Sequence, residues 1–471
     1  LFDFLQTDKE KRELLLGLEK PRFDDLKLYK IKELSDFQNI LISRALSAKD
    51  YFLVQGPPGT GKTSYLLKNL VRIIFEETKD HILLLAYTNR AVDEICSALR
   101  KIDDGFPFLR IGSKNCSEDT RNLLPHLTET LPLREVYKLT GKTRVIVSTV
   151  SSALMNREIF GLFRFDTAII DEASQILEPQ IIGILTKVKR FIMIGDEKQL
   201  PAVVLQEQNM VSTENPYLRS VNLLNPAVSL FERLLRNASE AGWNEAYGML
   251  RHQARMHEDI QFFPGNYFYQ GQLEAFFKQG WQSVPDSLFS SAEKEPLEYA
   301  LSASRIVFFD TPTEKRTKVN TFEAAAAVKL ILKIRDIYKR RDLDFNSNTI
   351  GVISPFRAQC SEIFRLLPPK MREMILIDTV ERFQGSERDI IIISYAVNHE
   401  HLLKKISSET VFAGAKVDRK LNVSITRARQ KLFLFGSSSL LEKLPVYGEF
   451  LQFIKQRSGM VSLKETMEIF R

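Results

Sequence analysis

The sequence predicts an α/β protein with two tandem domains, each built on a parallel sheet. Two observations support this prediction. Short apolar runs alternate with helical stretches along most of the chain, and runs that are apolar almost throughout are typical of parallel strands buried on both faces. The alternation is also interrupted near the middle of the chain, so that it forms two series of similar size.

The first series contains five expected strands, each followed by a helical stretch. They are the runs at 51–55, 81–87, 143–149, 165–171 and 190–196. The alternation breaks at about 103–142, where Pro107, Pro125 and Pro132 stand among polar residues, and we expect a small helical insertion there. Residues 1–34 are charged and helix-prone, so they form an expected N-terminal helical segment.

A second interruption covers roughly residues 205–250, after which the alternation resumes. The expected strands of the second series are the runs at 304–310, 348–354, 374–380, 388–394 and 431–437. We therefore expect domain one to span residues 35–242 and domain two to span residues 243–471.

Composition restricts the class of protein only loosely. The 66 Lys and Arg residues exceed the 59 Asp and Glu residues by seven, a balance that suits a polyanionic partner without requiring one. Cys96, Cys116 and Cys360 are widely spaced and form no C-x-x-C pair, which predicts a reducing compartment (cytoplasm or nucleus) and no structural zinc. The longest apolar run, at 390–393, is too short to span a bilayer, so we expect no membrane partner. No signal-peptide pattern opens the chain, and its start at Leu1 suggests a piece of a longer protein.

The most specific motif is the string GPPGTGKT, which follows an expected strand and precedes an expected helix. Its glycines let backbone N–H groups approach phosphates, and the helix N-terminus adds positive potential. We expect Lys62 to reach the β- and γ-phosphates of ATP and the Thr63 hydroxyl to hold Mg²⁺. The residues expected to bind ATP here are Gly56, Pro57, Pro58, Gly59, Thr60, Gly61, Lys62 and Thr63.

Two further strings complete an expected ATP-hydrolysing centre. In IIDEAS, Asp171 is the candidate Mg²⁺ ligand and Glu172 the candidate base that orients and deprotonates the attacking water. In GDEKQLPAVV, the Gln199 amide is placed to bond the γ-phosphate or that water. Taken alone, an acidic pair after a strand or a single glutamine is usually a solvated surface feature. Together with the phosphate loop, these residues indicate an ATP-hydrolysing site.

Together these strings resemble a superfamily 1 helicase. They are similar to the branch that contains the eukaryotic nonsense-mediated-decay helicase and the replication helicase–nuclease, and the resemblance extends from about residue 34 to 437. It implies two RecA-like P-loop domains with ATP in the cleft between them. It also implies a motor, expected to be a monomer, that acts on single-stranded nucleic acid, with DNA favoured over RNA.

The resemblance assigns roles in the first domain. Gln38 in DFQNI corresponds to an adenine-reading glutamine, and an amide suits that task because it can bond the N6/N7 edge of adenine bidentately. Thr88 and Asn89 in AYTNRAVDEI resemble a motif that grips single-strand phosphates. Ser148 and Thr149 in STVSSA resemble a second phosphate-contact motif.

The second domain is expected to supply arginines to the nucleotide. Arg255 in LRHQARMHEDI and Arg427 in LNVSITRARQKL resemble the family's γ-phosphate arginine and arginine finger. Charge develops on the γ-phosphoryl oxygens during hydrolysis, and a positioned arginine that stabilises it contributes about 10³ to 10⁵ in rate. The chain departs from the family at Ala254, where a tyrosine usually stacks on adenine, so we expect relaxed base selectivity.

Two other strings of the second domain resemble family motifs. VISPFRAQ matches a strand-end motif, in which Pro355 is a candidate nucleic-acid contact. DTVERFQGSERDIIIIS is similar to the fifth family motif, which implies that Gln384, Gly385 and Glu387 face the nucleotide while Thr379 faces the nucleic acid.

We therefore expect a translocase or helicase whose strand runs across the carboxyl ends of both sheets, with little sequence preference. The motifs DEASQ and QARMH, with the short connection between the two halves, resemble the 5′→3′ branch. Two alternatives stay open: an ATP-gated clamp on nucleic acid that unwinds nothing, and the motor half of a helicase–nuclease. No nuclease constellation is visible within residues 1–471.

Overall fold

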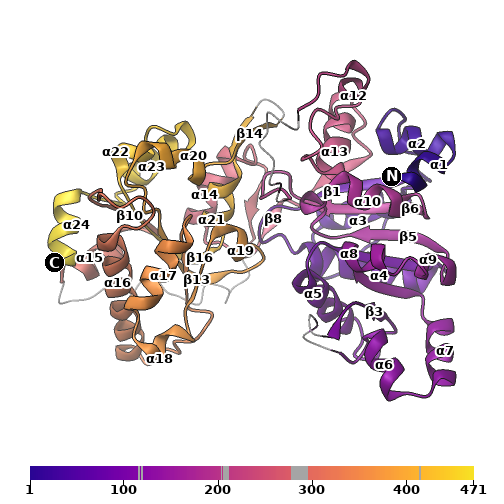
Figure 1. The fold of residues 1–471 in the computed structure, drawn as a ribbon, viewed down its shortest axis with the longest axis horizontal. Helices are drawn as coiled ribbons and strands as arrows, with labels where there is room; N and C mark the ends of the chain where they lie inside the picture. The colour runs from indigo at the N-terminus through magenta and orange to yellow at the C-terminus, as the bar shows by residue number, and fades with distance from the viewer. Residues whose placement is uncertain (115–116, 118–119, 203, 205–211, 277–294, 413–414) are drawn as a thin grey trace. The chain divides into compact units, whose positions relative to one another are not determined.

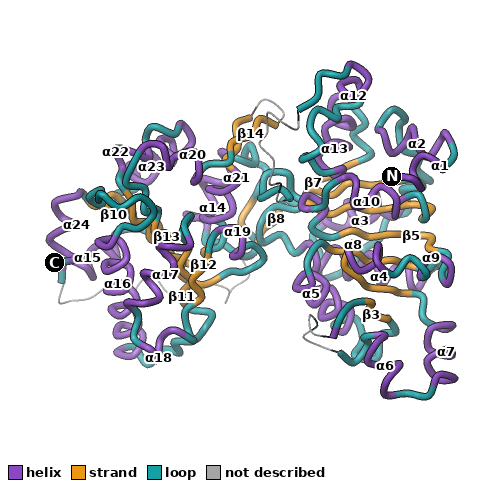
Figure 2. Tube along the Cα trace, viewed as in Figure 1, coloured by secondary structure: helices purple, strands orange, loops and turns teal. Residues whose placement is uncertain are grey.

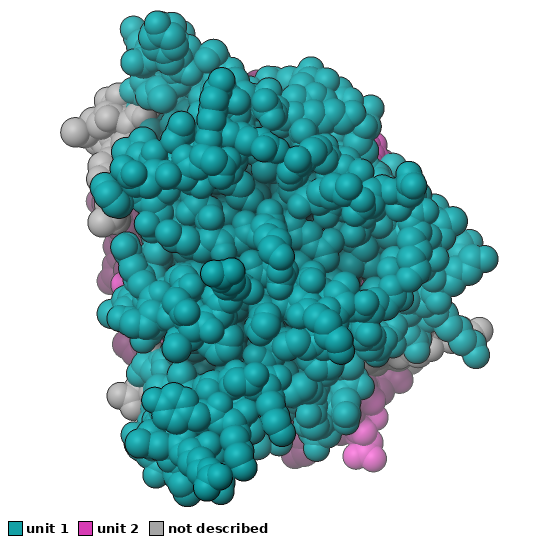
Figure 3. All heavy atoms as spheres, turned by 90° about the vertical axis from the view of Figure 1, so that its right-hand side faces the viewer, with its two compact units in different colours: residues 1–197, 201–251 teal, residues 198–200, 252–471 magenta. Residues whose placement is uncertain are grey.

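In a computed structural model, the chain forms two compact units (Figures 1 and 3). Unit 1 comprises Leu1–Glu197 and Pro201–Arg251, and unit 2 comprises Lys198–Leu200 and His252–Arg471. The structure describes residues 1–114, 117, 120–202, 204, 212–276, 295–412 and 415–471. Cys116 and part of the interruption near 205–250 therefore lie outside the described residues.

Unit 1 is built on a seven-stranded sheet in the order β3-β4-β2-β5-β6-β1-β7, and all of its strand pairs are parallel. The strands are β1 Tyr51–Gln55, β2 Ile82–Ala86, β3 Leu109–Ile111, β4 Val145–Thr149, β5 Phe165–Ile170, β6 Val188–Gly195 and β7 Tyr247–Met249. The five strands expected in the first series are all present. The edge strands β3 and β7 were not expected, because each has only three residues and no distinctive pattern.

Helices surround this sheet (Figure 2). Those of unit 1 are α1 Phe2–Gln6, α2 Lys9–Leu16, α3 Asp36–Ser47, a π-helical turn η1 Lys62–Leu67 that continues into α4 Lys68–Glu77, α5 Asn89–Arg100, α6 Leu124–Thr130, α7 Leu133–Lys142, α8 Val150–Met155, α9 Ile159–Leu162, the 3₁₀ turn η3 Ala173–Gln175, α10 Glu178–Leu185, α12 Pro216–Ser220 and α13 Leu230–Glu240. The expected insertion at 103–142 contains α6 and α7, but it also contributes β3 to the sheet. The N-terminal segment is helical only as far as α2.

A buried arginine attaches that N-terminal segment to unit 1. The Arg233 guanidinium donates hydrogen bonds to the carbonyls of Leu15 and Leu16 at 2.8 and 2.7 Å, at the C-terminal end of α2. It also pairs with the Glu178 carboxylate through two hydrogen bonds of 2.8 Å. Helix C-terminal carbonyls lack partners within their own helix, so a cation that bonds them stabilises the helix end where it docks.

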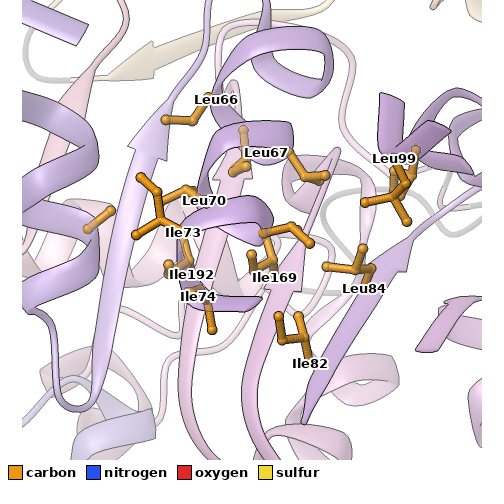
Figure 4. Close-up of a cluster of buried hydrophobic side chains, with 14 of the residues drawn as sticks. Leu66, Leu67, Leu70, Ile73, Ile74, Ile82, Leu84, Leu99, Ile169 and Ile192 are labelled. Atoms are coloured by element: carbon orange, nitrogen blue, oxygen red, sulfur yellow. The ribbon is translucent and has the colours of Figure 1, made fainter. Parts of the chain in front are cut away.

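Apolar side chains fix the helix that follows the phosphate loop. Figure 4 shows a cluster in which η1 and α4 face strands of the sheet. Its labelled members are Leu66, Leu67, Leu70, Ile73, Ile74, Ile82, Leu84, Leu99, Ile169 and Ile192. Each fully buried side chain of this kind contributes about 1.5–3 kcal/mol relative to exposure, so the start of this helix is held firmly against the sheet.

Unit 1 extends to Arg251, beyond the junction that we predicted near residue 243. The reason is strand pairing: Leu53 of β1 lies opposite Tyr247 of β7, and the Leu250 N–H donates to the Gln55 carbonyl at 2.8 Å.

Unit 2 has a six-stranded sheet in the order β12-β11-β13-β16-β10-β17, again parallel throughout. Its strands are β10 Ile306–Asp310, β11 Ile350–Ile353, β12 Leu376–Asp378, β13 Arg388–Ser394, β16 Ala428–Gly436 and β17 Met460–Val461. Two smaller sheets pair β8 His252–Gln253 with β9 Glu274–Ala275, and β14 Glu409–Phe412 with β15 Ala415–Asp418 in an antiparallel hairpin. The five expected strands of the second series are all present, which confirms the predicted fold class of two parallel-sheet α/β domains.

The helices of unit 2 pack on this sheet through apolar faces. The longest, α16 Thr321–Arg340, buries Ala327, Ile331 and Ile334 in a cluster with strand residues such as Ile392 and Phe433. The other helices are α14 Glu258–Tyr267, α15 Pro296–Ala303, α17 Arg357–Leu366, α18 Pro369–Arg372, α19 Val380–Phe383, η5 Glu400–Leu402, α20 Leu403–Ile406, α21 Arg419–Ile425, α22 Ser438–Leu441, α23 Pro445–Gln456 and α24 Leu463–Phe470. Among the described residues, no helix combines the length and the apolar character needed to cross a bilayer.

Candidate functional site

The phosphate loop of unit 1 joins β1 to η1 and has a shape that its own residues enforce. Gly59 and Gly61 have φ angles of 76° and 74°, in the left-handed region that other residues rarely adopt. The Thr60 hydroxyl donates to the Pro57 carbonyl at 2.7 Å, which closes the turn. The glycine spacing of the motif is therefore a requirement of the backbone.

Lys62 begins η1 and turns back over the loop. Its Nζ donates to the Gly56 carbonyl at 3.0 Å and lies 3.6 Å from Oε1 of Glu172. A Cβ at Gly56 would collide with the aliphatic part of the Lys62 side chain, so only glycine leaves room for this path. The lysine cation is thus placed at the mouth of the loop, beside an acidic side chain.

The acidic pair follows β5 and lies against the phosphate loop. The Thr63 hydroxyl donates to Oδ2 of Asp171 at 2.6 Å, and the Glu172 N–H donates to Oδ1 of Asp171 at 2.9 Å. Glu172 has a φ of 51°, a strained conformation for a non-glycine residue and one that is concentrated at functional sites. The structure thus brings together four residues predicted from two separate strings: Lys62, Thr63, Asp171 and Glu172.

Gln175 was not predicted from the sequence, and its amide donates to Oε2 of Glu172 at 2.9 Å. Its signal was present in DEASQ, where Gln175 stands one turn after Glu172 in the short helix η3. This hydrogen bond holds the Glu172 carboxylate in a defined orientation.

Burial and the neighbouring Glu172 charge raise the pKa of Asp171 to about 6, although the Thr63 hydroxyl and the Lys62 cation oppose the shift. Two carboxylates therefore share a site that contains one lysine cation. Like charges placed close together in a buried site raise one another's pKa. A bound cation at this position would relieve that repulsion.

Two of the residues predicted to act on the γ-phosphate, Gln199 and Arg427, lie in contact within unit 2. Nη2 of Arg427 donates to Oε1 of Gln199 at 3.3 Å, and Nε donates to the Val423 carbonyl at 2.9 Å. The Asn422 amide donates to the Lys198 carbonyl at 2.7 Å, which fastens the short segment that carries Gln199 to α21. Val203 of the same string lies outside the described residues.

A second arginine cluster of unit 2 contains two other predicted residues, Arg255 and Glu387. Glu387 forms ion pairs with Arg255 and, at 2.7 Å, with Arg429. Burial alone would raise the pKa of Glu387, but the two guanidinium groups outweigh it and lower the pKa to about 2. Arg429 was not predicted from the sequence, although it is the second arginine of the TRARQ string. Glu387, expected to face nucleotide, thus holds Arg255 in place.

Gln384 and Gly385 precede Glu387 closely in the sequence. Gly385 has a φ of 79°, which accounts for glycine at this position. The Gln384 amide nitrogen is buried and has no hydrogen-bond partner among the described residues. Buried amide donors are nearly always satisfied, so this nitrogen is an available donor for a ligand group.

The predicted adenine reader, Gln38, belongs to α3. Its Oε1 accepts from the Ser35 N–H at 3.1 Å in a capping box at the helix N-terminus. Nearby, the Arg251 guanidinium lies 4.6 Å from the centroid of the Phe37 ring. In this arrangement the Gln38 oxygen is engaged by its own helix.

The predicted nucleic-acid residues of unit 1 lie at neighbouring strand ends. Ala86, the last residue of β2, lies opposite Thr149, the last residue of β4, so the two motifs share one edge of the sheet. Thr88 and Thr149 are N-caps of α5 and α8. Ser148 was predicted to contact phosphate, but its side chain is fully buried and its hydroxyl donates to backbone carbonyls. Asn89 follows its cap at the first position of α5.

The same arrangement occurs in unit 2. Ile353 of β11 lies opposite Asp378 of β12, so Pro355 and Thr379 follow adjacent strand ends. Parallel α/β sheets bind ligands at their carboxyl edges, and both predicted residues lie there.

A phosphate loop with an acidic pair beside it, on one of two parallel α/β units, defines a P-loop nucleotide-binding protein. A family model described as an AAA domain matches residues 33–135 and 134–207, and a second model with that description matches residues 227–439. With the relatives described next, these matches show that the chain belongs to the superfamily 1 helicases.

The chain is 30% identical to a DNA replication ATP-dependent helicase/nuclease of Arabidopsis thaliana, over 98% of this chain and 33% of that protein. It is 26% identical to an uncharacterized ATP-dependent helicase of Methanocaldococcus jannaschii, over 97% of this chain and 76% of that protein. An arterivirus nonstructural protein 10 helicase, solved in complex with DNA, is 14% identical with a TM-score of 0.42, over 84% of this chain and 62% of that one. The chain thus spans about a third of the length of the Arabidopsis relative.

Proposed function

We propose that this chain is an ATP-dependent motor that moves along single-stranded nucleic acid. The observation that carries the proposal is the cluster at the phosphate loop, where Lys62, Thr63, Asp171 and Glu172 meet. Lys62 binds the β- and γ-phosphates. Glu172, oriented by Gln175, accepts the proton of the attacking water.

The Thr63 hydroxyl and the Asp171 carboxylate would hold Mg²⁺. Both are hard oxygen donors of the kind that Mg²⁺ prefers, and they lie 2.6 Å apart. The raised pKa of Asp171 reflects its burial first and the Glu172 charge second, and a bound divalent cation would offset both. When bound, Mg²⁺ would neutralise charge on the β- and γ-phosphates.

Arg255 and Arg427 stabilise the charge that develops on the γ-phosphoryl oxygens, and Gln199 orients the water or the phosphate. Glu387 fixes the Arg255 side chain, while Gln384 and Gly385 face the nucleotide. Gln38 reads adenine once its amide leaves the capping box. These roles rest on the family resemblance and on the contacts described within each unit.

The nucleic acid lies at the carboxyl edges of the sheets. Thr88, Asn89 and Thr149 contact it from unit 1, and Pro355 and Thr379 contact it from unit 2. DNA is the favoured polymer because the Arabidopsis relative is named as a DNA replication helicase/nuclease.

Single strands are expected to stimulate ATP hydrolysis, and binding is expected to weaken steeply with salt, because phosphate contacts release counterions. The measurement is the ATPase rate with single-stranded DNA, with single-stranded RNA and with neither. Strand affinity is measured alongside, between about 50 and 200 mM salt. Absence of stimulation by both polymers, or binding that salt leaves unchanged, would contradict the proposal. Unwinding of a labelled duplex separates a helicase from an ATP-gated clamp.

Movement is expected to be 5′→3′ along the bound strand. This direction rests on the resemblance of the DEASQ and QARMH strings to that branch of the family. Streptavidin displacement from an oligonucleotide biotinylated at one end measures it. Displacement should be faster from the 3′ end than from the 5′ end, and the reverse order would refute the assignment.

We also propose that the motor unit is a monomer and that the protein works in a reducing compartment, the cytoplasm or the nucleus. The choice of compartment rests on the spacing of the cysteines, of which Cys96 and Cys360 are buried.

A further inference from the structure

A stacked pair of side chains, Arg251 and Phe37, lies beside the phosphate loop of unit 1. The Arg251 guanidinium lies 4.6 Å from the centroid of the Phe37 ring. Phe37 belongs to the first turn of α3, directly before Gln38, whereas Arg251 follows β7. Arg251 is exposed and has no hydrogen bond or ion pair from its side chain among the described residues. The ring covers one face of this planar cation, and the other face is accessible.

Backbone pairing fixes Arg251 next to the start of the phosphate loop. The Leu250 N–H donates to the Gln55 carbonyl at 2.8 Å. Gln55 is the last residue of β1 and directly precedes Gly56, the first residue of the loop, while Leu250 directly precedes Arg251. The cation is therefore held close to the loop by the pairing of β7 with β1.

The helix that carries Phe37 is packed closely on the same strand. A Cβ at Gly248 of β7 would collide with the Leu41 side chain of α3, so only glycine permits this approach. The Arg44 guanidinium donates to the Tyr247 carbonyl at 2.9 Å and ties α3 to β7 a second time. The Phe37 ring thus supports the Arg251 guanidinium from a fixed element.

The strand order places this pair at the end of the nucleotide site opposite to the hydrolysing groups. Glu172 follows β5, the phosphate loop follows β1 and Arg251 follows β7, and the order across the sheet is β5-β6-β1-β7. In a nucleoside triphosphate the γ-phosphate and the base are at opposite ends. A nucleotide that presents its γ-phosphate to Glu172 therefore directs its base toward β7 and α3.

We propose that Arg251, supported by Phe37, is the platform on which the base of the bound nucleoside triphosphate stacks, and that it gives the site a preference for purines. This inference rests on the proposed function and adds two residues to the nucleotide site. A planar guanidinium stacks on nucleobases, and a purine offers it a larger face than a pyrimidine does. Gln38 would then read the edge of the base whose face Arg251 covers.

This platform predicts the opposite of what Ala254 predicted from the sequence. The absence of a ring at Ala254 led to the expectation of relaxed base selectivity, whereas stacking on Arg251 predicts that ATP binds more tightly than UTP. A purely electrostatic Arg251 would instead attract the phosphates of every triphosphate equally. The affinities for ATP, UTP and base-free tripolyphosphate distinguish these three cases.

The test measures these three affinities by isothermal titration calorimetry with Mg²⁺ present. Arg251→Ala should weaken ATP binding by about 5- to 100-fold, the range expected for losing one stacked base, and should weaken UTP binding less. Arg251→Lys keeps the charge but has no planar face, so it should lose the preference for ATP over UTP and keep the wild-type affinity for tripolyphosphate. Phe37→Leu should weaken ATP binding in the same direction by about 2- to 5-fold, because the guanidinium loses its support.

The matched control is Arg457→Lys in unit 2, where the guanidinium also lies 4.6 Å from a phenylalanine ring, that of Phe262, and which should leave all three affinities unchanged. If the wild-type chain binds no nucleoside triphosphate, the proposed function itself fails. If the wild type binds ATP and UTP equally, or if Arg251→Lys keeps the wild-type ratio of the two affinities, only the stacking role is refuted. Equal losses for ATP, UTP and tripolyphosphate in Arg251→Ala would also refute it and would assign Arg251 to the phosphates.

Discussion

Glu172→Gln is expected to lower ATP turnover by about 10² to 10⁴-fold while leaving ATP binding intact. The amide has nearly the shape of the carboxylate and can remain beside Gln175, but it cannot accept the proton of the attacking water. Lys62→Ala is expected to abolish both binding and turnover, because the phosphates lose their cationic partner. Steady-state hydrolysis and titration with a fluorescent ATP analogue measure the two quantities separately.

Glu94→Gln is a matched control for Glu172→Gln. Glu94 lies in α5 close enough for the charges of Asp171 and Glu172 to contribute to raising its pKa, although burial is the main cause. Its substitution removes the same charge from the same neighbourhood without removing the proposed base, so turnover should change by less than about tenfold. Wild-type turnover in Glu172→Gln would exclude Glu172 as the base. Equal losses in both variants would assign the effect to the local charge.

Arg255→Ala and Arg427→Ala are expected to reduce turnover by about 10²-fold or more and to leave nucleotide affinity within about tenfold. The reason is that charge on the γ-phosphoryl oxygens grows mainly in the transition state, so its stabilisation appears in the rate more than in binding. Single-turnover hydrolysis, with affinity measured on the same samples, checks both parts.

The structure supplies the controls for these arginine variants. Arg429→Ala removes the other guanidinium paired with Glu387 and should leave turnover near the wild-type rate, since no role at the phosphate is proposed for it. If Arg429→Ala slows hydrolysis as much as Arg255→Ala, the effect acts through Glu387. Arg427 is buried and bonded to Gln199, so its variant also requires a thermal unfolding measurement, and Arg427→Lys tests the charge with less disturbance. Normal turnover in both alanine variants would remove the case for arginine-assisted catalysis.

The central strands of both sheets were predictable because their signal is local. A run such as Ile82–Ala86 is apolar throughout, and burial on both faces of a parallel sheet requires that pattern. The phosphate loop was predictable for a similar reason. Its glycines satisfy a backbone requirement set by the residues next to them, as the positive φ angles of Gly59 and Gly61 demonstrate.

The edge strands were not predictable from local pattern. The three residues of β7 become a strand only because β1 offers an unpaired edge, and this pairing moves the end of unit 1 to Arg251. The sequence near residue 243 contains no trace of that pairing, because hydrogen bonds between distant segments leave no periodic signal.

The sequence by itself determined that the chain has two parallel α/β domains and one phosphate loop, and it identified the acidic pair and the arginines that we propose to act in hydrolysis. Only the tertiary structure decided which of these groups touch. The pairing of Glu387 with both Arg255 and Arg429, and the support that Gln175 gives Glu172, depend on where side chains come to lie after folding.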